Sequence, residues 1–242
     1  MSRVAVFRPD DGRLATATDL LASLGVEVVA DPMLEVRPTG AEPRTDAAYV
    51  VLTSKTGAEL VAEAGWTPGD ATTCAIGDRT ADALRERGYA VDLVPEEFSS
   101  RGLVGALADR TDGRAVEVAR SDHGSDVLTD GLNEAGAYVH ETVLYELVRP
   151  AGAGESAALA AAGELDAALF TSSLTVEHFL DAATERGERD AAVAGLEEAV
   201  VGAIGEPTRE TAAGLGVSVD VVPETATFEA LARAVVAELD DR

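Results

Sequence analysis

The stretch IGDRTADALRERGYAVDLVP, residues 76–95, has a near copy late in the chain, IGEPTRETAAGLGVSVDVVP, residues 204–223. Both copies read Ile-Gly-acidic-x-Thr, followed by a span with helical spacing, a Gly, and a Val-rich run that ends in Pro. This order is typical of a turn that opens a helix and is followed by a strand. A chain that carries the pattern twice is expected to contain two related units.

The repeat extends well beyond these two stretches. RVAVFRPDDG at Arg3 aligns with RAVEVARSDHG at Arg114, and DAAYVVLTSKTGAELV at Asp46 aligns with DAALFTSSLTVEHFL at Asp166. The separation grows from 111 to 120 residues between these pairs and reaches 128 between the two opening stretches. Loop insertions in two copies of one unit produce such a drift. Duplication implies two similar lobes with a cleft between them, but it does not by itself indicate a chemistry.

Helical and strand periods alternate along the whole chain, which predicts an α/β fold with parallel sheets. We expect a helix over 14–24 that ends at Gly25, and a long extended run over 26–36. Residues 151–163 are predicted to be a loop that leads into a helix. Each copy is predicted to contain five strands, the size of a flavodoxin-like sheet. In the first copy the other strands are expected at 4–7, 47–54, 72–77 and 89–95.

Length and composition exclude several classes of protein. The 242 residues suit one large domain or two small ones, and no stretch approaches the ~20 apolar residues of a membrane span. The first residues enter a strand-like run without an export signal, so we expect a cytoplasmic protein. Cys74 is the only cysteine and the three histidines show no ligand spacing. We therefore expect no disulfide and no metal.

Acidic residues dominate the charge. Asp and Glu number 44 against 19 Lys and Arg, the formal net charge is −25, and Lys55 is the only lysine. Such a field repels nucleic acid and anionic membranes, so we expect neither as a partner. We also expect the protein to be a monomer in solution. At molar salt the Debye length falls to ~3 Å, and the composition favours a halophilic archaeon with a salt-rich cytoplasm. The alternative is an ordinary acidic enzyme from a high-GC genome.

Four strand-to-helix turns are candidates for anion binding, because the free N–H groups of a helix N-terminus bind anions without a basic side chain. They lie at 53–56, 77–80, 171–173 and 205–208, each after a predicted strand. Their hydroxyl groups have a second interpretation as helix caps, and the basic side chains have one as simple surface charges. The candidate ligand-binding residues are Arg8, Thr53, Ser54, Lys55, Thr80, Ser172, Ser173 and Thr208.

In these features the chain resembles the uroporphyrinogen-III synthase family. The resemblance rests on the paired Thr-Ser turns at 53–54 and 171–172, the two IGxxT blocks, the segment LVPEEFSSRGL, and the VLYE strand around Tyr145. These features occur in the family's order over essentially the whole chain. No single one of them is diagnostic.

The resemblance implies that the second strand of each copy crosses between lobes. Lobe one would then contain residues 1–37 and 149–242, and lobe two would contain residues 38–148. The crossing strands would be 31–38 and 141–150, which have similar endings, E-V-R-P in the first and E-L-V-R-P, one residue longer, in the second. In each, Pro ends the strand because it has no N–H to donate.

The resemblance also implies a reaction. The family is a group of hydro-lyases that cyclise hydroxymethylbilane, invert its last pyrrole ring and release water, without a cofactor. It places a tyrosine at Tyr145, directed into the cleft between the lobes, and this residue is our candidate general acid. A packed aromatic residue beside Val143 and Leu147 is the alternative interpretation.

A function of another class also fits a duplicated α/β chain. A non-catalytic bilobal protein that closes around an anionic small molecule would have the same organisation. The missing export signal and the lack of a DNA-binding or output segment favour the synthase.

Overall fold

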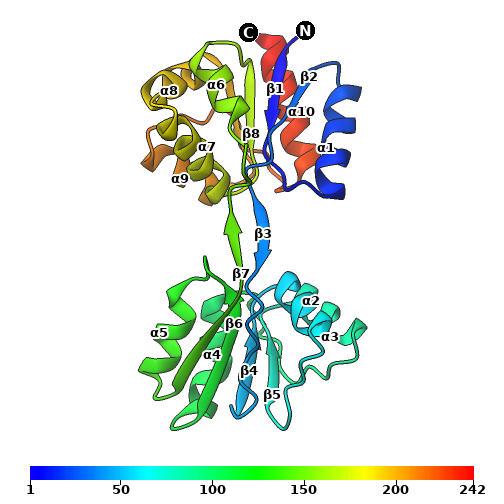
Figure 1. The fold of residues 1–242 in the computed structure, drawn as a ribbon, viewed down its shortest axis with the longest axis vertical. Helices are drawn as coiled ribbons and strands as arrows, with labels where there is room; N and C mark the ends of the chain where they lie inside the picture. The colour runs from blue at the N-terminus through cyan, green and yellow to red at the C-terminus, as the bar shows by residue number, and fades with distance from the viewer. The chain divides into compact units, whose positions relative to one another are not determined.

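The structure, a computed structural model that describes residues 1–242, divides into two compact units. Unit 1 consists of Met1–Glu35 and Val148–Arg242, and unit 2 consists of Val36–Leu147. The chain passes from one unit to the other in β3 (Glu35–Pro38) and near the end of β7 (Tyr138–Val148) (Figure 1). None of the helices combines the length and the apolar character that crossing a bilayer requires.

Unit 1 is built on a four-stranded parallel sheet in the order β2-β1-β8-β9. Its strands span Arg3–Val6 (β1), Glu27–Ala30 (β2), Ala167–Phe170 (β8) and Val200–Ala203 (β9). Its helices span Gly12–Ser23 (α1), Glu155–Ala161 (α6), Ser173–Glu185 (α7), Arg189–Glu198 (α8), Glu206–Gly214 (α9) and Phe228–Asp241 (α10).

Both faces of this sheet are buried, because alternate strand residues point to opposite sides. On β1, Val4 and Val6 pack against α1 and α10, whereas Ala5 and the following Phe7 pack against α6 to α9. Phe7 also stacks on Phe170 with their ring centroids 4.7 Å apart. Figure 1 shows the helices of unit 1 on both sides of its strands. Because helices cover both faces of the sheet, the sequences of these strands are near-continuous apolar runs.

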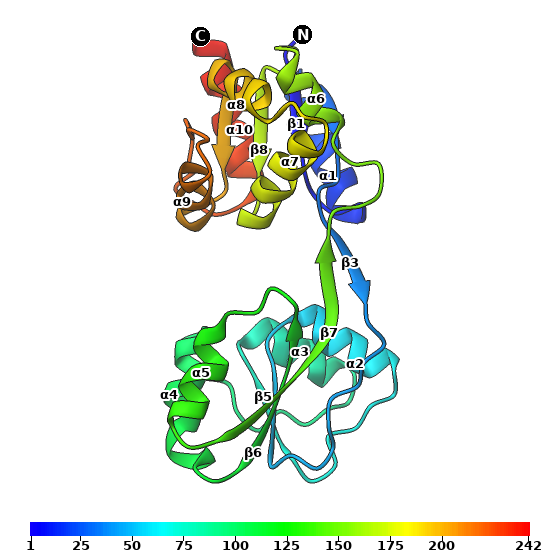
Figure 2. The same ribbon diagram turned by 60° about the vertical axis from the view of Figure 1, so that its left-hand side comes forward.

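Unit 2 contains a five-stranded sheet in the order β3-β7-β6-β4-β5, in which β7, β6, β4 and β5 pair in parallel. The remaining strands are Tyr49–Leu52 (β4), Thr72–Ala75 (β5) and Ala115–Ser121 (β6). Helices α2 and α3 cover one face and α4 and α5 the other (Figure 2). These helices span Lys55–Glu63 (α2), Asp78–Glu86 (α3), Ser100–Thr111 (α4) and Asp126–Glu134 (α5).

The strand predicted at 89–95 is wrong, and each sheet has one parallel strand fewer than a flavodoxin-like sheet. Only Leu93 forms a bridge, to Cys74, and Val221 forms the matching bridge to Gly202. The reason is an aspartate side chain next to each bridge. The Asp92 carboxylate accepts the Thr73 N–H at 2.8 Å, and Asp220 accepts the Val201 N–H at 2.8 Å. These N–H groups are no longer available to a strand ladder. A proline also follows each bridge by two residues.

The long extended run predicted over 26–36 is also wrong, because it is interrupted between β2 and β3. Asp31 is buried there, and its carboxylate accepts the backbone N–H groups of Gly154 at 2.9 Å and Ser156 at 2.8 Å. The Ser156 hydroxyl donates to the same carboxylate at 2.5 Å. Asp31 thus caps the start of α6 and turns the chain away from the sheet. Pro32, which has no N–H, follows it directly.

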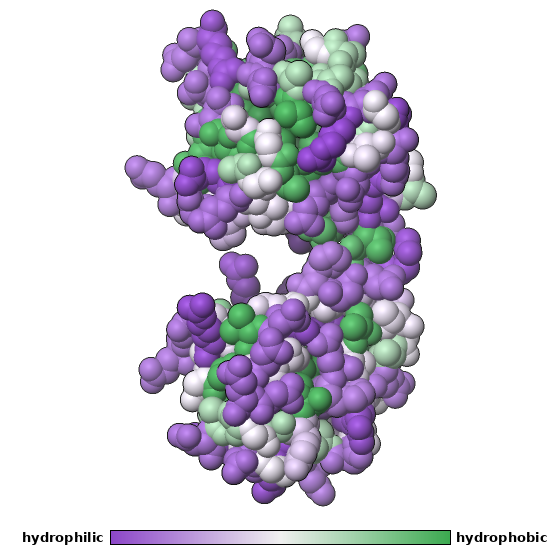
Figure 3. Space-filling model, turned by 90° about the vertical axis from the view of Figure 1, so that its left-hand side faces the viewer, coloured by the Kyte–Doolittle hydropathy of each residue, from purple (hydrophilic) through white to green (hydrophobic).

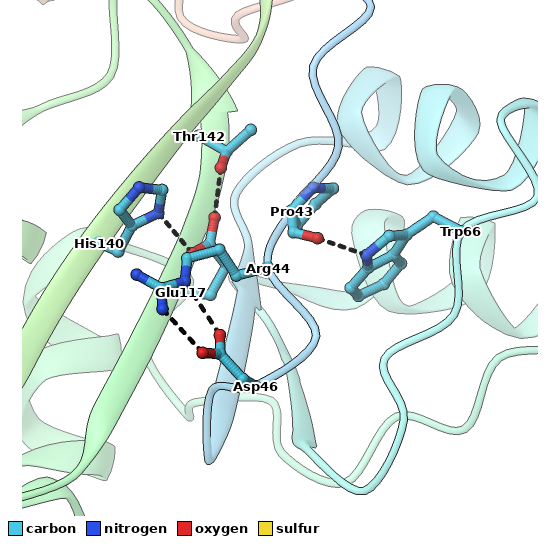
Figure 4. A network of polar contacts seen from close by, with 7 residues as sticks. All are labelled: Pro43, Arg44, Asp46, Trp66, Glu117, His140 and Thr142. Carbon is cyan, nitrogen blue, oxygen red and sulfur yellow. Dashed lines mark hydrogen bonds and ion pairs between the residues drawn. The ribbon is translucent and has the colours of Figure 1, made fainter.

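A second buried carboxylate holds the middle of unit 2 (Figure 4). Glu117 on β6 is fully buried, accepts the Thr142 hydroxyl at 2.5 Å, and lies 2.7 Å from Nδ1 of His140. Both partners belong to β7, so these contacts tie β6 to β7 through side chains as well as through the ladder. Glu117 is the third residue of β6, well before the carboxyl end of that strand. We therefore infer that this network stabilises the fold of unit 2 and takes no part in ligand binding.

Candidate active site

The predicted site residues form two groups, one in each unit, and almost all follow the carboxyl ends of parallel strands. Ligands of open α/β sheets bind at this edge. Unit 2 contains Thr53, Ser54, Lys55, Thr80 and Tyr145, and unit 1 contains Arg8, Ser172, Ser173 and Thr208.

Ser54 and Tyr145 meet in unit 2. Ser54 is the N-cap of α2, and its Oγ accepts the Gly57 N–H at 2.9 Å. The Tyr145 hydroxyl donates to the same Oγ at 3.0 Å, although the two residues are 91 positions apart. Tyr145 is only 6% exposed, so this side chain fits both interpretations, the packed aromatic residue and the candidate general acid. Its ring is packed in the core and its hydroxyl reaches the strand-to-helix turn.

This arrangement leaves one proton of the pair free. A serine oxygen accepts two hydrogen bonds, and here the Gly57 amide and the Tyr145 phenol occupy both positions. The Ser54 hydroxyl hydrogen is therefore not needed for either contact. This hydrogen is available for donation to a group outside the pair, and the Tyr145 hydroxyl can in turn donate its own proton to Ser54.

The neighbours of Ser54 in the turn differ in their surroundings. The Thr53 N–H bonds the Ala119 carbonyl at 3.4 Å, which attaches the turn to β6. The Lys55 ammonium is exposed and lies 3.6 Å from the Glu59 carboxylate, which also pairs with Arg87 at 3.0 Å. Lys55 therefore shares its partner and retains exposed donors. Exposed pairs of this kind contribute little to stability.

The two IGxxT turns have the same cap geometry. Gly77 is the N-cap of α3 and Gly205 that of α9, both in extended backbone, and neither helix has a side-chain cap. Thr80 and Thr208 follow in the first turns and are each 4% exposed. The first amides of these helices are thus free of side-chain partners. The turns offer backbone N–H groups to an anion more readily than they offer threonine side chains.

In unit 1 the two turns are joined to each other. Ser172 is the N-cap of α7, and its Oγ accepts the Thr175 N–H at 3.3 Å. The Ser173 hydroxyl donates to the Pro207 carbonyl at 3.2 Å and accepts from Thr211 at 2.8 Å. Ser173 is consequently engaged within the protein. Pro207 also lacks an N–H, so the turn of α9 has one donor fewer than that of α3.

Arg8 follows β1 and is half-buried. Its guanidinium carbon lies 5.1 Å from the centroid of the Phe228 ring, a cation–π arrangement. Burial lowers the pKa of Arg8, and the nearby positive charge of Arg13 lowers it further, while Asp11 acts in the opposite direction. The aromatic contact fixes the side chain at the carboxyl edge of the unit 1 sheet.

Two further side chains, Cys74 and Phe98, lie near the turn at Gly77, the first in sequence and the second in space. Burial raises the pKa of the Cys74 thiol to about 12, so this cysteine is not a nucleophile at neutral pH. Phe98, which the sequence analysis did not single out, is 58% exposed beside Gly77. Its position in the quoted segment LVPEEFSSRGL, as the one aromatic residue among acidic and polar neighbours, was the available signal.

Comparison with known proteins gives one consistent result. The family model described as uroporphyrinogen-III synthase HemD matches residues 15–233. A putative uroporphyrinogen-III synthase of Methanothermobacter thermautotrophicus is 30% identical, over 98% of this chain and 99% of that protein. The uroporphyrinogen-III synthase of Synechococcus elongatus is 27% identical over 66% of each chain.

Solved structures show the same fold at lower identity. A mutant uroporphyrinogen III synthase of Thermus thermophilus superposes with a TM-score of 0.73 and 19% identity, covering all of both chains. The uroporphyrinogen-III synthetase of Helicobacter pylori gives a TM-score of 0.63 and 16% identity, covering 100% of this chain and 99% of that one. These matches confirm the predicted mixed α/β fold with parallel sheets.

Proposed function

Because the chain belongs to the uroporphyrinogen-III synthase family, we propose that it converts hydroxymethylbilane to uroporphyrinogen III with loss of water. The observation that carries this function is the family match over nearly the whole chain. The protein is thus a lyase of porphyrin biosynthesis. The match does not favour the alternative of a non-catalytic binding module.

The substrate's eight carboxylates are proposed to bind at the strand-to-helix turns. In unit 2 the first amides of α3 are free of side-chain caps and Lys55 retains exposed donors. In unit 1 the turn of α9 and the fixed guanidinium of Arg8 supply the corresponding groups. Backbone amides and helix dipoles bind anions without adding net positive charge. A strongly acidic protein can therefore hold a polyanion.

The Ser54–Tyr145 pair is proposed to act as the general acid. The free Ser54 proton is transferred to the departing hydroxyl of the first ring, and Tyr145 replaces it through the 3.0 Å hydrogen bond. A phenol is a weak acid at neutral pH. The leaving group is assisted by the electron-rich pyrrole, so weak acid assistance is sufficient.

The remaining steps need positioning more than chemistry. Loss of water leaves an electron-deficient carbon on the first ring, and the substituted carbon of the last ring attacks it to form a spiro centre. The bond from that ring carbon to its bridge then breaks, and the bridge reattaches at the unsubstituted ring carbon. That carbon releases a proton, which restores the one given to the leaving hydroxyl. Holding one conformation for this sequence is the main task of the protein.

Isomer analysis tests the function. Without conformational control the chain ends join directly and give the symmetric type I isomer. Hydroxymethylbilane incubated with the native protein in molar KCl, then oxidised and separated by chromatography, is expected to give the type III isomer. Heat-denatured protein is the control and is expected to give type I. Native protein that gives only type I would remove the proposed function.

We also propose a halophilic origin, as the net charge of −25 and the single lysine suggest. Hydrophilic residues cover much of the face drawn in Figure 3. The same charge supports a monomer in a salt-rich cytoplasm without nucleic acid as a partner.

Stability should therefore rise with salt. Screening the repulsion between acidic residues is expected to raise the Tm by about 10 °C between low and molar KCl, roughly 2.5–5 kcal/mol for a chain of this length. The measurement is thermal unfolding followed by circular dichroism across a KCl series. A Tm that is the same at both ends of the series would contradict the halophilic origin and leave the enzymatic function untouched.

Finally, we propose that the chain arose by internal duplication. The first sheet has the order β2-β1-β8-β9 followed by Val221, and the second has β7-β6-β4-β5 followed by Leu93. In both, an aspartate side chain occupies an amide of the last full strand. These matching details support two copies of one unit that have exchanged parts.

A further inference from the structure

Phe98 is an exposed aromatic side chain in a chain that has few of them. Aromatic residues make up 4% of the sequence, and of the five phenylalanines only Phe98 is largely exposed. Phe7, Phe170 and Phe179 pack against one another in the core of unit 1. Burying a phenyl ring is favourable, so the exposure of Phe98 suggests that its ring has a role other than core packing.

The turn that presents Phe98 is fixed from behind by α4. The Ser99 N–H bonds the Glu97 carbonyl at 2.7 Å, and the Ser99 hydroxyl donates to the Glu97 carboxylate at 2.6 Å while accepting the Gly102 N–H at 3.0 Å. A Cβ on Gly102 would lie 1.9 Å from the Glu97 carbonyl oxygen, so only glycine allows this contact. The backbone on both sides of Phe98 is therefore held, and the ring projects from a constrained turn.

The ring lies beside the cap of α3. A Cβ on Gly77 would lie 3.0 Å from Cγ of Phe98, so one side of the aromatic side chain covers the Gly77 backbone. More than half of the side chain remains accessible. At the matching position before α10 the sequence has Ala226, and Gly205 meets no aromatic side chain. An aromatic side chain thus covers the glycine of one IGxxT turn, and none meets the glycine of the other.

We propose that Phe98 is a positioning residue whose open face stacks on one pyrrole ring of the bilane. This inference rests on the proposed function. A pyrrole is flat and electron-rich, and aromatic rings prefer offset stacked or edge-to-face contacts with such a partner. The carboxylates on the same pyrrole ring then reach the free amides at the start of α3 and the exposed Arg79 in its first turn. The turn before α3, together with Phe98, would thus bind one pyrrole ring and the carboxylates attached to it.

Substitution of Phe98 tests the inference through KM and the isomer ratio. Phe98→Ala is expected to raise KM for hydroxymethylbilane about fivefold to tenfold, the lower end of stacking contributions, and to increase the fraction of type I product. Phe98→Trp should keep both wild-type values, and Phe98→Leu should lie between. Tyr138→Ala is the matched control, because Tyr138 is 72% exposed at the opposite, amino end of its strand.

A binding measurement gives an independent readout. Trp66 is the only tryptophan and is buried, so the indole of Phe98→Trp is the only exposed one. Uroporphyrinogen III, added without oxygen, is expected to quench that indole with saturation. If native protein makes type III product and Phe98→Ala keeps the wild-type KM, isomer ratio and Tm, the inference is overturned and the function stands. If native protein makes only type I, the function itself fails.

Discussion

Tyr145→Phe is expected to slow formation of the type III isomer by about ten- to a thousandfold, at most the lower part of the range for general-acid catalysis. The substitution keeps the packed ring and removes only the hydroxyl that donates to Ser54 at 3.0 Å. Ser54 still has a proton to give but loses the donor that replaces it. Initial rates with hydroxymethylbilane in molar KCl measure the effect. Once the spontaneous type I product is subtracted, the isomer ratio should change little, because the carboxylate-binding turns are intact.

The partner substitution is Ser54→Gly, which removes the hydroxyl at a cost of only a few tenths of a kcal/mol in helix capping. Ser125→Gly removes a serine cap from α5 that lies outside the candidate site residues, and is the control for capping alone. Since residues that act as a unit are not additive, the double variant Ser54→Gly with Tyr145→Phe should be no slower than the slower single one. A Tyr145→Phe rate within about twofold of wild type, or complete loss of activity in a folded protein, would contradict the relay.

Asp31→Asn is expected to destabilise unit 1 by about 2–4 kcal/mol, because a buried carboxylate with several hydrogen bonds is replaced by a neutral amide. The carboxylate accepts two backbone amides and the Ser156 hydroxyl at the start of α6. An asparagine keeps one acceptor oxygen and places an NH₂ group against donors. The midpoint of unfolding followed by far-ultraviolet circular dichroism should fall by roughly 4–16 °C.

Asp10→Asn provides the matched control, since Asp10 is exposed and the substitution removes the same charge. Tryptophan fluorescence adds a separate readout, because Trp66 lies in unit 2 and reports that unit alone. Equal midpoints for Asp31→Asn and Asp10→Asn would show that the Asp31 contacts do not hold α6 in place.

Much of the fold was accessible from sequence because its signals are local. The paired IGxxT blocks predicted two matching strand-to-helix turns, and the apolar runs of β1, β4 and β5 predicted parallel strands. Capping residues follow the same logic. Ser54 and Ser172 stand directly before helices and cap them, as their residue type suggests.

The features that sequence reasoning missed depend on contacts between distant residues. Asp31 interrupts a run of high strand propensity by bonding amides 123 and 125 positions away. Asp92 prevents a strand by occupying an amide 19 positions earlier. The hydroxyl of Tyr145 bonds Ser54, which is 91 positions away in the sequence, so the sequence around either residue does not reveal this contact. Tertiary contacts override local propensity in each case.

Ring inversion is tested most directly by following one carbon–carbon bond. Hydroxymethylbilane is labelled with carbon-13 at its last bridge carbon and at the last-ring carbon bonded to it, and the product is examined by NMR. Ring inversion breaks that bond, so we expect the one-bond coupling between the two labels to disappear with native protein in molar KCl. Heat-denatured protein should give product that retains the coupling. Retention of the coupling with native, folded protein would contradict the account.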